Sequence, residues 1–147
     1  MPRVKLEEQS NYEFIHTVTV RVTDLNYGNH LANDALVGLI GDARVHVFHE
    51  LNARELDLGD GQTGIILADL VVNFKAEGFL FDTLQIETHI GDISRKSFRM
   101  FHRINKDGQP LALAEAGIIT FNYDERQVVA IPDVFLRAVK RKLSSID

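Results

Sequence analysis

The chain has 147 residues, a formal net charge of −5 and no cysteine. Its length and its composition, 45% hydrophobic and 25% charged, are typical of one soluble globular domain spanning residues 1–147. The acidic balance argues against a nucleic-acid partner, and the lack of cysteine excludes disulfides, thiolate metal ligands and a cysteine nucleophile.

The sequence begins Met1-Pro2-Arg3-Val4-Lys5 and lacks the apolar stretch of a secretion signal. No apolar run approaches the ~20 residues that are needed to cross a bilayer. We therefore expect a cytoplasmic protein that does not insert into a membrane.

Hydrophobic periodicity predicts a strand, a loop and one long helix in the first third of the chain. From Phe14 to Val22 apolar and polar residues alternate, which is the period of a half-buried strand. The polar stretch 23–30 contains Asp24, Asn26, Gly28 and Asn29 and is typical of a loop. From Asn33 to Leu51 apolar residues recur every three or four positions, and Asn33 or Asp34 is placed to cap the first turn.

The rest of the chain predicts four more strands and a short helix. Runs rich in apolar and β-branched residues cover 64–75, 83–90, 96–104 and 111–123. Between the last two runs, Asp107-Gly108 is the strongest hairpin signal in the sequence. Pro132 opens an amphipathic segment that ends in basic residues, as expected of a short terminal helix.

The order of these elements predicts the fold class. One strand, one long helix and four consecutive strands with hairpin-like turns imply an antiparallel sheet with a single helix on one face. We expect an α+β protein with the hotdog fold, in which a five-stranded antiparallel sheet wraps around the long central helix.

The loop and the start of the helix carry a recognisable motif. Residues 24–44 read DLNYGNHLANDALVGLIGDAR. This segment resembles that of the 4-hydroxybenzoyl-CoA-thioesterase-like hotdog proteins, which typically reads Asp-x-Asp-x-x-Gly-His-Val-Asn-Asn and continues into a helix ending near Glu-Ala-Arg. The spacing from Asp24 through His30 to Asp42-Ala43-Arg44 is kept without a gap.

The resemblance implies a function and a mode of assembly. It implies hydrolysis of an acyl-CoA or another acyl thioester to the free acid and the thiol, without a cofactor. It also implies an acyl-binding tunnel at the interface of a homodimer, or of a tetramer built from such dimers.

Thioester hydrolysis needs hydrogen-bond donors for the developing oxyanion, and backbone N–H groups at the start of a helix supply both donors and a positive dipole. Residues at this point are the candidate substrate-binding set: Gly28, Asn29, Asn33 and Asp34. A base or nucleophile is also needed, and the loop offers Asp24, His30 and Asp34.

The sequence departs from the family pattern at Asn26, which stands where many relatives hold the catalytic Asp. An amide can orient water or bond the carbonyl oxygen, but it cannot act as a base. Either Asp24 takes over through a one-residue shift of the loop, or His30 is the base with Asn26 and Asn29 as positioning groups. The candidate catalytic set is therefore Asp24, Asn26 and His30.

Each candidate also has a purely structural interpretation. Asp24 can cap a turn, and Asn26 and Asn29 can support the loop. Asp34 can be an ordinary residue of the first helical turn. Asp69 interrupts an apolar strand, so this candidate substrate-binding residue either faces the partner's loop or points to solvent at a sheet edge.

The histidines do not show the spacing of a metal site. His46 and His49 share a helix face, but the sequence offers no evident third ligand near them. We therefore expect no metal site.

Two other functions remain open for this fold. A hotdog dehydratase or hydratase acting on acyl thioesters would need a His and an acidic residue that cooperate across the dimer, and its usual loop, in which Pro-Gly follows the His, is absent here. A non-catalytic acyl-thioester-binding module is suggested by Asn26.

Overall fold

The protein is described by a computed structural model that covers residues 3–145. In chain order its elements are β1 (Phe14–Thr19), the 3-10 helix η1 (Val22–Asp24), α1 (Asn33–Glu50), β2 (Thr63–Phe74), β3 (Thr83–Gly91), β4 (Ser97–Lys106), β5 (Gln109–Asn122), β6 (Gln127–Val128) and α2 (Asp133–Ser144).

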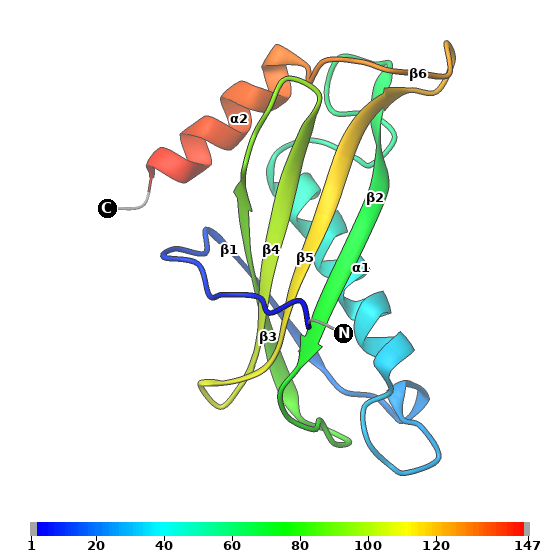
Figure 1. The fold of residues 1–147 in the computed structure, drawn as a ribbon, viewed down its shortest axis with the longest axis vertical. Helices are drawn as coiled ribbons and strands as arrows, with labels where there is room; N and C mark the ends of the chain where they lie inside the picture. The colour runs from blue at the N-terminus through cyan, green and yellow to red at the C-terminus, as the bar shows by residue number, and fades with distance from the viewer. Residues whose placement is uncertain (1–2, 146–147) are drawn as a thin grey trace.

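The strands form one antiparallel sheet in the order β1-β3-β4-β5-β2, with the two-residue strand β6 paired to β5. The sheet curves around α1, and α2 lies at one end of the sheet (Figure 1). This arrangement confirms the predicted hotdog fold. The structure also contains β6, which was not predicted because it is too short to show a hydrophobic period in the sequence.

The connection between β2 and β3 corrects the expectation that all four later strands follow one another through hairpin-like turns. β2 pairs with β5 at one edge of the sheet, whereas β3 lies between β1 and β4. The chain therefore crosses from one part of the sheet to another between Phe74 and Thr83. This crossing segment reaches the loop of residues 23–30 that carries the motif, here called the motif loop.

The Asp107-Gly108 hairpin is confirmed. Both residues have positive φ, 52° and 77°, and Lys106 pairs with Gln109 on either side of them. A two-residue turn with two positive φ angles matches the twist of the flanking strands, which explains the Asp-Gly sequence.

The core lies between the concave face of the sheet and α1. Along β4 every second side chain is buried, among them Phe98, Met100 and Ile104. From α1, Ile40 and Phe48 pack into the same interior. The alternation in the strands and the three- and four-residue spacing in the helix thus bury the faces that the sequence predicted.

The start of α1 differs from the prediction that Asn33 or Asp34 caps it. The N-cap is Ala32, which is extended and makes no side-chain cap bond, and its carbonyl accepts the hydrogen bond of the Leu36 N–H at 3.0 Å. Asn33 and Asp34 are already helical, because the anchored loop before them fixes where the helix begins. No helix within residues 3–145 has the length and apolar character needed to cross a membrane.

Candidate active site

The motif loop is fixed by backbone hydrogen bonds to itself and to the segment between β2 and β3. The Asn26 N–H donates to the His30 carbonyl at 2.9 Å, which closes the loop. The Leu31 N–H donates to the Gly78 carbonyl at 2.7 Å, which docks the loop on the crossing segment. The position of His30 is therefore set by the backbone on both sides of it.

The side chain of Asn26 stabilises the motif loop through hydrogen bonds to backbone N–H groups of the same loop. Its Oδ1 accepts hydrogen bonds from the Gly28 N–H at 2.9 Å and the His30 N–H at 3.2 Å. Asn29 has a positive φ of 64°, and its N–H donates to the Asn26 carbonyl at 3.0 Å. Asn and Gly tolerate this geometry, so both asparagines have the turn-supporting role that was one of the two interpretations.

His30 lies beside an acidic and an aromatic side chain of the crossing segment. Its Nδ1 is 3.2 Å from Glu77 Oε2, and its ring centroid is 5.4 Å from that of Phe79. The ion-pair distance does not have hydrogen-bond geometry, and within the described residues the buried Nδ1 has no hydrogen-bond partner. A buried polar atom left in this state is unusual outside functional sites.

A pocket of about 240 Å³ opens beside this imidazole. Asn26, His30 and Glu77 provide its polar lining, and Phe74 and Leu111 contribute apolar wall. Asn33, the first residue of α1, also lines it, which places the start of the helix at the pocket. The N–H groups of a first helical turn have no acceptor within the helix, so they can bind a partial negative charge here.

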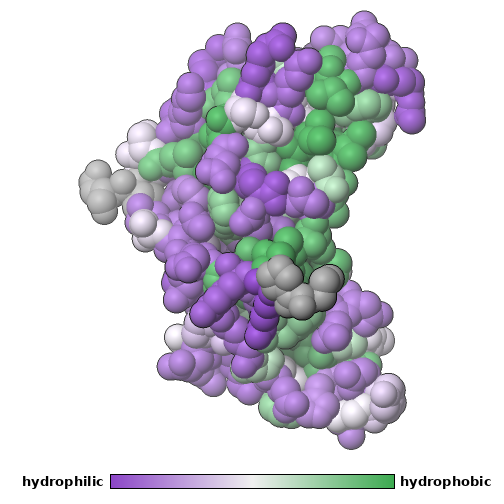
Figure 2. Space-filling view, in the orientation of Figure 1, coloured by the Kyte–Doolittle hydropathy of each residue, from purple (hydrophilic) through white to green (hydrophobic). Residues whose placement is uncertain are grey.

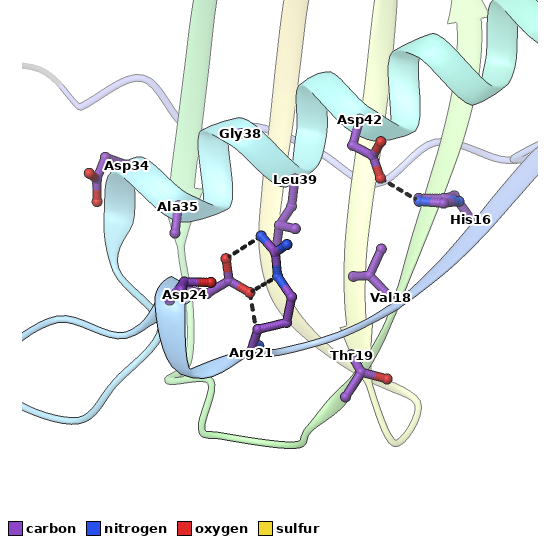
Figure 3. Close-up of a pocket in the computed structure, with 11 residues that line it drawn as sticks. His16, Val18, Thr19, Arg21, Asp24, Asp34, Ala35, Gly38, Leu39 and Asp42 are labelled. Atoms are coloured by element: carbon purple, nitrogen blue, oxygen red, sulfur yellow. Dashed lines mark hydrogen bonds and ion pairs between the residues drawn. The ribbon is translucent and has the colours of Figure 1, made fainter.

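Asp24 occupies a different place. Its carboxylate accepts from the Arg21 N–H at 2.8 Å, and its Oδ1 lies 3.0 Å from the Arg21 guanidinium (Figure 3). The hydrogen bond from the Arg21 side chain lowers the pKa of Asp24 despite the burial of the carboxylate. Asp24 is thus held as an ionised cap of η1, one of its two predicted roles.

Asp24 and Asp34 line a second, larger pocket of about 690 Å³ between β1 and α1 (Figure 3). The structure therefore divides the predicted residues. Asn26, His30 and Asn33 meet at the smaller pocket, whereas Asp24 and Asp34 face the larger one. We take the smaller pocket as the candidate active site because it contains the imidazole next to a carboxylate.

Asp69 lines neither of these two pockets. It follows a bulge in β2 and lies opposite Gly117, with Arg99 Nη1 at 3.2 Å from its Oδ2. The hydrogen bonds from Arg99 lower the pKa of the half-exposed Asp69 carboxylate. A Cβ on Gly117 would lie 2.5 Å from this carboxylate, so the glycine leaves room for the ion pair.

Sequence reasoning did not find Glu77 and did not place Phe79 at the site. Both lie in the crossing segment, far from His30 in the sequence, and no periodicity links them to the motif. The short polar segment before Gly78 is the one local sign that the chain turns there.

Comparison with known proteins assigns the family. The family model of the thioesterase-like superfamily matches residues 20–139. No curated protein matches the chain.

Solved structures share the fold at low sequence identity. A 1,4-dihydroxy-2-naphthoyl-CoA thioesterase from Synechocystis has a TM-score of 0.79 and 17% identity, with 86% of this chain and 95% of that chain covered. A gentisyl-coenzyme A thioesterase has a TM-score of 0.76 and 22% identity, with 86% and 99% covered. A hypothetical protein from Staphylococcus aureus, solved in complex with CoA, has a TM-score of 0.82 and 18% identity, with 89% and 84% covered.

These findings confirm the resemblance that the motif carried. The family match includes the motif loop, the long helix and the whole sheet from β2 to β5. The chain belongs to the thioesterase-like superfamily.

Proposed function

We propose that the chain is an acyl-CoA thioesterase and that the pocket of His30 is its active site. The observation that carries the proposal is the position of the imidazole: its buried Nδ1 lies 3.2 Å from Glu77 Oε2 and has no hydrogen-bond partner among the described residues. An imidazole held beside a carboxylate is the usual arrangement of a general base. A CoA thioester as substrate agrees with the CoA bound to the Staphylococcus aureus structure.

In the proposed reaction His30 accepts a proton from a water molecule as the water oxygen attacks the thioester carbonyl carbon. The tetrahedral intermediate then collapses, the carbon–sulfur bond breaks, and the imidazolium returns the proton to the leaving thiolate. The products are the free acid and CoA. Glu77 orients the imidazole and stabilises its protonated form between the two steps.

The start of α1 is the proposed binding site for the carbonyl oxygen. Charge develops on this oxygen in the transition state, and the N–H groups of Asn33 and Asp34 are in the first turn, where they have no helical acceptor. The amide NH₂ of Asn26 is a further donor at the pocket, because its Oδ1 is engaged by the loop.

Asp24 is less suited to be the base, although the family pattern favours an acid in this region. Its carboxylate already accepts hydrogen bonds from the backbone and the side chain of Arg21. Using it as a base would require breaking these bonds, whereas His30 Nδ1 makes no hydrogen bond within the described residues that would have to break.

We further propose that two copies of the chain form the active unit. Among the described strands β2 pairs only with β5, so its other edge is open. Exposed apolar side chains on α1 and β2 are Val37, Val45, Leu67 and Phe74. Apolar surface also gathers along the edge of the molecule on which β2 lies (Figure 2).

A second copy placed against this edge would pair β2 with β2 and cover the apolar side chains. Phe74 belongs both to this surface and to the lining of the pocket, so the partner would complete the acyl-binding wall. Asp69, near the middle of β2, would then lie close to the partner, which keeps it as a candidate substrate-binding residue. The proposal includes a tetramer built from two such dimers. It also includes a cytoplasmic location.

The direct test is a thiol-release assay on the purified protein with aliphatic and aromatic acyl-CoAs. The proposal expects saturable release with at least one class of acyl group. CoA binding without release from any substrate of the panel would instead support the non-catalytic binding module, and hydration of an enoyl-CoA would support the hydratase.

A further inference from the structure

Three metal-ligating side chains that the proposed reaction does not use converge between β1 and α1. His16 of β1 places its Nε2 2.9 Å from Asp42 Oδ2 (Figure 3). One turn further along α1, His46 stacks on His16 with a ring-centroid distance of 3.9 Å and an interplanar angle of 25°. One ligand atom from each of the three residues lies within 4.8 Å of the others.

We propose that His16, Asp42 and His46 bind a divalent transition-metal ion of the Zn²⁺ class. Two imidazole nitrogens and one carboxylate oxygen form a donor set that Zn²⁺ accepts, and three protein ligands leave a fourth position for water. From the sequence alone, His46 was paired only with His49 as a possible metal ligand. In the folded chain, His16 from a distant strand and Asp42 from the same helix lie beside His46.

The distances are close to those of a bound ion once the His46 side chain rotates, because its Nδ1 now lies 2.9 Å from the backbone carbonyl oxygen of Asp42 and must leave it. Zn²⁺ bonds of about 2.0–2.2 Å in tetrahedral geometry require ligand atoms about 3.4 Å apart. The 2.9 Å between His16 and Asp42 and the 3.8 Å between His46 Nδ1 and Asp42 Oδ1 lie on either side of this value. Asp42 and His46 are half exposed, so their side chains can rotate, while the better buried His16 gives a fixed point.

The charges around the cluster favour a cation. His16 and Asp42 line the larger pocket together with Asp24 and Asp34, and the Arg21 guanidinium, which also lines it, is paired with Asp24. A bound ion would lie at the rim of this pocket, apart from His30. The metal site and the thioesterase activity can therefore be tested independently, and the failure of one proposal does not affect the other.

The test is isothermal titration of the tag-free, chelator-treated protein with Zn²⁺. We expect one ion per chain. His46→Ala and Asp42→Asn should each weaken binding at least tenfold, and both positions are exposed on α1. His49→Ala is the matched control, because it removes an exposed histidine of the same helix outside the cluster and should leave the affinity unchanged.

A second readout is the visible absorption of added Co²⁺, which reports ligand geometry. Absorption bands of a four-coordinate ion should appear with the wild type and with His49→Ala and should be absent with His46→Ala. No saturable Zn²⁺ binding to the wild type, or binding that His49→Ala weakens as much as His46→Ala does, would overturn the proposal.

Discussion

Asn26 and His30 have different roles in the motif loop. The amide at position 26 binds two backbone N–H groups and so holds the loop, which a carboxylate at that position could also do. The imidazole at position 30 has its Nδ1 3.2 Å from Glu77 Oε2, and within the part of the chain that the structure describes this nitrogen has no hydrogen-bond partner. The replacement of the family's Asp by Asn therefore moves the proposed base to His30 and leaves the loop intact.

Glu77 is predicted to be a positioning residue for His30. Glu77→Gln removes the negative charge beside the imidazole but keeps the size of the side chain. Steady-state kinetics should show kcat lowered about 10- to 100-fold with KM changed little, because the charge acts on proton transfer and not on substrate binding. An unchanged kcat would show that Glu77 has no part in the reaction.

His102 links stability to pH. It is buried against Thr88, with Nδ1 and Oγ1 2.9 Å apart, and burial lowers its pKa to about 3. The unfolded chain, with the ordinary pKa of 6.5, binds the proton first as pH falls, so stability is lost below pH 6.5 and down to about 3.

Urea unfolding measures this loss. Between pH 7 and pH 5 the wild type should lose about 2 kcal/mol through His102, a loss that His102→Gln removes. Equal pH dependence in the two proteins would contradict the assignment.

At the scale of elements, the sequence was sufficient for the five longer strands, the long helix and the Asp107-Gly108 turn, but not for the two-residue β6 or for the end of the first strand, which stops at Thr19 and not at Val22. These depend on local periodicity and turn chemistry, which tertiary contacts here reinforce. The crossing from β2 to β3 was not predictable, because strand order depends on pairing across the whole sheet. Glu77 was missed for the same reason: its contact with His30 exists only once that crossing is made.

Two glycines give a matched test of element packing. A Cβ on Gly64 of β2 would lie 2.7 Å from the Glu55 carbonyl oxygen, whereas a Cβ on Gly38 of α1 meets nothing within 4 Å. Gly64→Ala should therefore lower the free energy of unfolding by about 1–3 kcal/mol, and Gly38→Ala should raise it by up to about 1 kcal/mol. Chemical denaturation measures both, and a neutral Gly64→Ala would show that the backbone at Glu55 moves easily.

At the scale of the whole molecule, the open edge of β2 and the apolar residues beside it are the surface that the proposed dimer would cover. The edge strand is twelve residues long, and such an edge is exposed to aggregation unless it is covered. The proposed dimer covers it and at the same time extends the wall of the pocket beyond Phe74.

Leu67→Arg tests this assembly. Leu67 is 43% exposed on β2 and lies outside the lining of the His30 pocket. Sedimentation should show a dimer or tetramer for the wild type and a monomer for the variant, because two arginines would meet at a two-fold interface. A wild type that is monomeric at micromolar concentration would contradict the dimer.

His30, and not Asp24, is the proposed base of the thioesterase. Single-turnover hydrolysis of the best acyl-CoA substrate by the wild type, His30→Gln and Asp24→Asn distinguishes the two residues, provided that the folded fraction of each protein is measured. We predict a loss of about 100-fold or more for His30→Gln and, for Asp24→Asn, a less stable protein that keeps most of its rate. A full rate for His30→Gln, or a folded Asp24→Asn without activity, would contradict the claim.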